Sequence, residues 1–186
     1  MGLLQQIGSM IGGEQNVQSM AAGQGNFSDP NAPDHQNFQQ MVRHAPPGML
    51  EQVFSHVAQN VNPQDYSNHV TPGVGGTNPL GGLGSGALGM IASTLMGKLT
   101  GGGGYNSGSL LSRIPGLRTT DPRQMDEHQV ASLASYTQQN HPDLYGQAAA
   151  QIGQQQPDIL HSFLGKAGLA IGAAALASHF MTPRNG

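Results

Sequence analysis

The hydrophobic positions of this chain fall into short helical stripes separated by polar or glycine-rich stretches. Near the N-terminus, apolar residues recur at the three- and four-residue spacing of one helix face. They are Leu3, Leu4, Ile7, Met10 and Ile11. Residues 1–11 therefore predict a short amphipathic helix, which is marginal alone and needs a partner surface. Residues 12–33 have no such period and predict a flexible linker.

Further helices are predicted on both sides of the glycine-rich centre of the chain. Asp34 begins a short helix, and residues 46–61 carry the clearest amphipathic stripe of the first half. In the second half, one helix is expected after Asp121-Pro122 and Asp126-Glu127, and two more are expected to begin near Pro142 and Pro157, residue types that favour a helix start. There is no convincing run of alternating β-branched residues. The expected fold class is all-α.

Two parts of the chain resemble each other. Residues 39–44 and 123–128 share Gln, Met and His at matching positions, and each segment leads through an amphipathic helix to a Gln-Asn stop and a Pro-Asp-Tyr turn. The match predicts two pseudo-repeated units of short helices, 34–100 and 121–186, joined by a glycine-rich linker over 101–120. Because the spacings differ by a few residues, composition alone could produce part of the match.

Each predicted unit ends in an apolar helix rich in small residues, over about 80–99 and 167–181. In the first, small residues recur at every fourth position and share one helix face, as in a glycine zipper. They are Gly81, Ser85, Gly89, Ser93 and Gly97. The second helix repeats the spacing with Gly168 and Gly172. Such a face lets another helix backbone approach closely, so these seven residues are the predicted helix–helix contacts.

Three interpretations of these helices remain open: close packing in a soluble oligomer, contact with a membrane surface, or a flexible glycine-rich loop. Residues 80–97 are uncharged and close to the minimum length of a span, but the second helix is too short to cross. Each interior glycine costs a helix up to ~1 kcal/mol relative to alanine. Since only packing offsets that cost, we favour close helix–helix contact.

Composition excludes several classes of protein. Charged residues make up only 9% of the chain, and seven Lys and Arg cannot form a basic face for nucleic acid. The chain has no Cys, which excludes disulfides and thiolate chemistry. The first residues lack a basic region followed by a long apolar stretch, so we expect a cytoplasmic protein, with peripheral contact at the inner membrane as the alternative.

The sequence contains no complete catalytic motif. Residues 84–89 match GxGxxG, but no strand precedes them and no acid follows at the required distance. The eight His are scattered, and a metal site would need long-range convergence, for example of His44 with His128 if the units pair. We expect surface or capping roles for these His, no cofactor and no enzymatic activity.

The opening residues 1–4, the Leu/Gly tract over 80–84 and the Gln-rich helices resemble the YidB-like group of small bacterial proteins. The resemblance covers about a third of the chain. It implies a bacterial, soluble, helical protein and no particular activity. The paired Met-x-x-His units and the terminal Ala/Gly helix depart from the group.

The favoured hypothesis is a non-catalytic, homo-oligomeric scaffold or adaptor whose small-residue helices form subunit contacts. The alternative is a membrane-peripheral anchor subunit of a larger complex. Its N-terminal stripe of Leu3, Leu4, Ile7 and Ile11 would dock on lipid or on a partner, and it could shelter a lipophilic ligand. The third hypothesis is a module that binds a metal or small ligand through His.

Overall fold

A computed structural model describes residues 32–61, 80 and 83–181 of the chain. Helices account for most of this part of the chain, and it contains no strand, which confirms the all-α fold class. The helices are α3 (Pro33–His44), α4 (Pro47–Asn60), α6 (Ser85–Gly101), α7 (Ser107–Arg113), α8 (Glu127–Asn140), α9 (Pro142–Gln155) and α10 (Pro157–Met181).

Most of these helices begin where the sequence predicts. Proline occupies the first position of α3, α4, α9 and α10, where its missing N–H leaves no hydrogen bond unmade. Helix α8 begins differently, because the Asp126 side chain accepts a hydrogen bond from the Gln129 amide at 2.9 Å. Single residues therefore determine where the chain starts each of these helices.

Three predicted boundaries differ from the structure. The helix expected over 80–99 begins at Ser85 and ends at Gly101. The linker expected over 101–120 contains α7, which is capped by the Asn106 side chain accepting from the Ser109 amide at 2.8 Å. The two helices expected after Pro157 form one continuous helix, α10. Helix α10 continues through its glycines, and α4 packs against Gly168 and Gly172.

The two Gln-Asn stops are helix ends in the structure. Asn60 ends α4, and its side-chain amide donates to the His56 carbonyl at 2.8 Å. Asn140 ends α8 in the same way, donating to the Tyr136 carbonyl at 2.9 Å. In each case the side chain folds back onto the carbonyl four residues earlier, within the last turn of its own helix.

The two segments that share Gln, Met and His in the sequence, 39–44 and 123–128, have different structures. Residues 39–44 form the last turns of α3, whereas residues 123–126 lie in a turn before α8. The turn over 63–66 lies outside the described residues, so only its counterpart at the start of α9 is seen. The predicted pseudo-repeat is therefore not shown by the structure.

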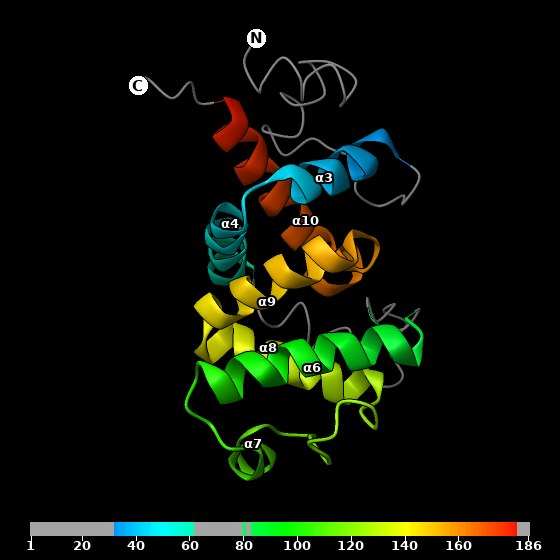
Figure 1. Cartoon of the computed structure of the whole chain (residues 1–186), viewed down its shortest axis with the longest axis vertical. Helices are drawn as coiled ribbons and strands as arrows, with labels where there is room; N and C mark the ends of the chain where they lie inside the picture. The colour runs from blue at the N-terminus through cyan, green and yellow to red at the C-terminus, as the bar shows by residue number, and fades with distance from the viewer. Residues whose placement is uncertain (1–31, 62–79, 81–82, 182–186) are drawn as a thin grey trace.

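Helix α9 lies at the centre of the fold (Figure 1). Helices α3, α4 and α10 lie on one side of it and α6 and α8 on the other, and α9 packs against all five. The central side chains are fully buried and come from both predicted units; among them are Leu50, Phe54, Leu95, Ala148 and Ile152. One continuous core thus joins residues from both halves of the chain.

Helices α4 and α9 cross closely at Gly146. A Cβ atom added at Gly146 would collide with the Ser55 hydroxyl and would lie 2.7 Å from the Glu51 carbonyl oxygen. At the other end of α9, a Cβ at Gly153 would lie 2.8 Å from Val42 of α3. At Gly146 the obstacles include backbone atoms, so alanine or a larger residue there would force α4 and α9 apart. At Gly153 the obstacles are side-chain methyl groups of Val42 and Leu160, which would have to shift.

Two buried polar contacts hold helices of the core together. The Tyr145 ring stacks on Phe163 of α10 with 4.8 Å between ring centroids, and its hydroxyl donates to the Phe163 carbonyl at 3.3 Å. The Gln138 side chain of α8 donates to the Ala58 and Val61 carbonyls at 3.2 and 3.0 Å. The second contact satisfies carbonyls at the end of α4.

Candidate functional site

Helix α6 contributes one apolar face to the core. Its buried positions pack against α8 and α9, and they are Leu88, Ile91, Ala92, Thr94, Leu95, Met96 and Leu99. These residues recur at helical spacing and lie opposite most of the small residues singled out in the sequence. The burial of α6 thus depends on its large side chains.

The small residues of α6 lie on the outside of the molecule. We call Ser85, Gly86, Gly89, Ser93 and Gly97 the α6 small-residue face. All are exposed except Gly89, which is half-buried beside the Pro122 carbonyl. A Cβ added at Gly86 or Gly97 would meet no atom within 4 Å.

No helix in the described part of the chain covers this face. The expected close approach of another helix backbone is therefore not made within the chain at Ser85, Ser93 or Gly97. Gly81 lies outside the described residues. Contact of this face with another subunit stays a prediction.

The glycines of α10 have a different environment. A Cβ added at Gly168 would lie 3.3 Å from a Val57 methyl group, and one added at Gly172 would lie 3.6 Å from the Phe54 ring. Both glycines are buried against α4. The two small-residue helices thus differ: α10 packs its glycines inside the molecule, and α6 presents them to solvent.

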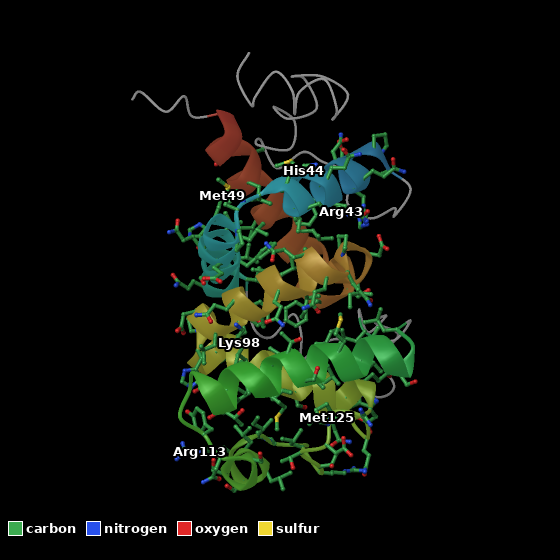
Figure 2. All side chains as sticks on the ribbon, viewed as in Figure 1. Arg43, His44, Met49, Lys98, Arg113 and Met125 are labelled. Carbon is green, nitrogen blue, oxygen red and sulfur yellow. The ribbon has the colours of Figure 1, made fainter. Side chains whose placement is uncertain are left out.

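The two His residues considered for a metal site are not brought together. His44 is exposed at the end of α3, where its Nδ1 donates to the Gln40 carbonyl at 2.8 Å. His128 is exposed in the first turn of α8, with Nε2 3.8 Å from the Glu127 carboxylate. The two helices lie on opposite sides of α9, as the labels on His44 and on Met125, just before α8, show (Figure 2). Within residues 32–61, 80 and 83–181, no group of three or more His, Asp or Glu could hold a metal ion.

A polar groove lies between α4 and α9. It is open to solvent, has a volume of about 550 Å³ and is lined by Gly48, Glu51, Gln52, Ser55, His56, Gln59, Asp143 and Gln147. Most of these residues form one polar stripe of α4, and the last two come from the first turns of α9. The groove could not be predicted from the sequence, because an ordinary solvated helix face has the same polar stripe.

A cluster of aromatic residues holds the end of α6 against the corner between α8 and α9. The Tyr105 hydroxyl lies 3.0 Å from His141 Nε2, and the Tyr105 ring meets Tyr136 edge-on at 6.4 Å between centroids. The guanidinium of Arg113 lies 5.5 Å from the Tyr105 ring centroid. A hydrogen bond with Tyr136, followed by burial, raises the pKa of Tyr105, while the charge of Arg113 opposes the increase. These contacts hold the glycine-rich segment that follows α6 against the end of α8.

The N-terminal stripe of Leu3, Leu4, Ile7 and Ile11 lies outside the described residues. In the part of the chain that is described, no helix has the length and apolar character needed to cross a membrane.

In the part of the chain that the structure describes, the fold is all-α with a continuous core, and the α6 small-residue face is uncharged and lies uncovered by these residues. Comparison of the chain with models of protein families, with curated proteins and with solved structures finds no match.

Proposed function

We propose that this protein is a non-catalytic scaffold or adaptor that assembles with copies of itself through the α6 small-residue face. The observation that carries the proposal is the exposure of Gly86 and Gly97 within a helix. Each interior glycine costs a helix up to about 1 kcal/mol relative to alanine. Packing within the chain offsets this cost in α10 but leaves it nearly uncompensated in α6.

A second copy of the helix would provide the missing contact. Small side chains allow two helix backbones to approach closely, so that many weak contacts form along the pair. Residues 85–97 include no charged side chain, so no charge would have to be buried in the contact. The half-buried Lys98 lies just beyond this segment.

The substitution Gly97→Leu separates assembly from folding. Because a side chain at this position would meet open space, the fold of the single chain should be unaffected, and helix propensity should improve by several tenths of a kcal/mol. In the assembly, the same side chain would stand between two close backbones and overpack the contact by about 1–3 kcal/mol.

Sedimentation equilibrium and light scattering at tens of micromolar test the proposal. Wild type should be larger than a monomer, and Gly97→Leu should shift the distribution toward monomer without loss of helical signal. Gly108→Leu places the same side chain on exposed α7 and should leave the mass unchanged. A monomeric wild type, or an unchanged mass for Gly97→Leu, would refute the proposal.

A further inference from the structure

The groove between α4 and α9 is lined by two acidic side chains, Glu51 and Asp143, and by no Lys or Arg. Neither carboxylate has a hydrogen-bond or ion-pair partner among the residues that the structure describes. The chain has only ten acidic residues in all, so two without partners around one groove form a local concentration of negative charge.

The other polar lining groups are the amides of Gln52, Gln59 and Gln147, the Ser55 hydroxyl and the His56 imidazole, each of which can accept a hydrogen bond. A volume of about 550 Å³ lies within the range of sites for small organic molecules, roughly 300–1,000 Å³. The groove thus combines negative charge, acceptor oxygens and room for a small ligand.

We propose that this groove binds an elongated organic cation through its ammonium or guanidinium groups. The cation is either a free linear polyamine or the Lys and Arg side chains of a partner chain. Charged N–H donors form short, strong hydrogen bonds with carboxylates, and the amide oxygens would accept the donors that remain. This site is independent of the α6 small-residue face.

The arrangement suits a ligand with spaced charges better than a metal ion. The two carboxylates come from different helices, and no group of three or more His, Asp or Glu in the described chain could hold a metal. A divalent metal needs several ligands within about 2–2.6 Å of one point. A linear polyamine instead carries its charges along a chain and can pair with two separate carboxylates.

The walls of the groove are held in place by the core. At the crossing beneath it, Gly146 allows α9 to touch Ser55 and the backbone of α4. Since neither helix can approach further, the groove is formed before a ligand arrives, and binding requires little ordering of the chain.

Titration calorimetry of the full chain with spermidine at low salt tests the proposal. We expect saturable binding at one site per chain, weakened by added salt. Glu51→Gln and Asp143→Asn should each raise Kd about three- to tenfold. The matched control Glu127→Gln makes the same charge change on α8, outside the groove, and should keep the wild-type Kd. Equal weakening in the control and the groove variants would overturn the proposal.

A second probe distinguishes the two sources of the cation. A capped peptide containing two lysines should bind more tightly than spermidine if partner side chains are the ligand, and less tightly if a free polyamine is. Absence of binding by both probes to the wild type overturns the proposal.

The location can be checked without any variant. In wild-type protein, spermidine should shift the NMR amide signals of Gln52, Ser55, Gln59 and Gln147. Shifts confined to residues outside α4 and the first turns of α9 would overturn the assignment.

Discussion

A methyl group added at Gly146 would enter the close crossing of α4 and α9. In Gly146→Ala, the new Cβ would lie 2.5 Å from the Ser55 backbone nitrogen and 2.7 Å from the Glu51 carbonyl oxygen. Ordinary contacts of this kind are about 3.5–4 Å. Because both neighbours are backbone atoms of α4, a change of rotamer cannot remove the overlap, and α4 must move away from α9 by about 1 Å.

Two opposing effects determine the size of the change. Overpacking of a close contact costs about 1–3 kcal/mol. Replacing a helical glycine with alanine stabilises the helix by up to about 1 kcal/mol. The overpacking term is the larger one here, so we expect Gly146→Ala to lower the free energy of unfolding by about 1–2 kcal/mol. For a chain of this length, this corresponds to a fall in Tm of about 2–8 °C.

The matched control is the same substitution at Gly97, where the added Cβ would meet no atom within 4 Å. Gly97→Ala should raise the stability of the single chain, because only the helix-propensity term acts. Urea unfolding, followed by circular dichroism at a concentration where the protein is monomeric, measures both variants. We expect the free energy of unfolding to fall in Gly146→Ala and to rise in Gly97→Ala.

The double variant Ser55→Ala/Gly146→Ala tests which atoms of α4 the new methyl group overlaps. Ser55→Ala removes the hydroxyl nearest the new methyl group but leaves the two backbone atoms in place. It should therefore restore only part of the stability lost in Gly146→Ala. If Gly146→Ala instead stabilises the protein as much as Gly97→Ala does, α4 and α9 do not cross as closely as described.

Two further predictions concern single hydrogen bonds. Asp126→Ala removes the cap of α8 and should lower the free energy of unfolding by about 1 kcal/mol at neutral pH. Hydrogen bonds from Gln129 hold the pKa of Asp126 below its usual range, so this contribution is complete above the ordinary Asp pKa and is lost as pH falls through the lower folded value. Urea unfolding at a series of acidic pH values should show the two proteins converging, and a constant difference would contradict this cause. Tyr145→Phe removes the bond to the Phe163 carbonyl but keeps the ring stack; thermal unfolding should show a loss of about 0.5–1.5 kcal/mol, and no loss would show that the bond contributes nothing.

Local features of the sequence were sufficient to predict most of the helices, but not α7, which lies in the linker predicted over 101–120. The prolines at 33, 47, 142 and 157 and the acid at 126 lie at helix starts, and Asn60 and Asn140 lie at helix ends. The apolar stripe of α4 is buried as its spacing predicts. These features succeed because starting, ending and orienting a helix depend mainly on residues within one or two turns of each other.

The candidate sites depended on contacts between residues far apart in the chain. Glycines at four-residue spacing occur in both α6 and α10, and the sequence assigned them the same role. In the structure, Gly172 lies against Phe54, whereas a side chain at Gly97 would meet open space. The close crossing of α4 and α9 involves Gly146, to which sequence analysis gave no role.

The amino-acid sequence by itself therefore determined the all-α class, many of the helix boundaries and which residues share a helix face. Only the tertiary structure decided which faces are covered, where α4 and α9 touch and which polar side chains surround a groove. The physical reason is that helical periodicity is a local property, whereas burial of a face depends on which other helix the folded chain brings against it.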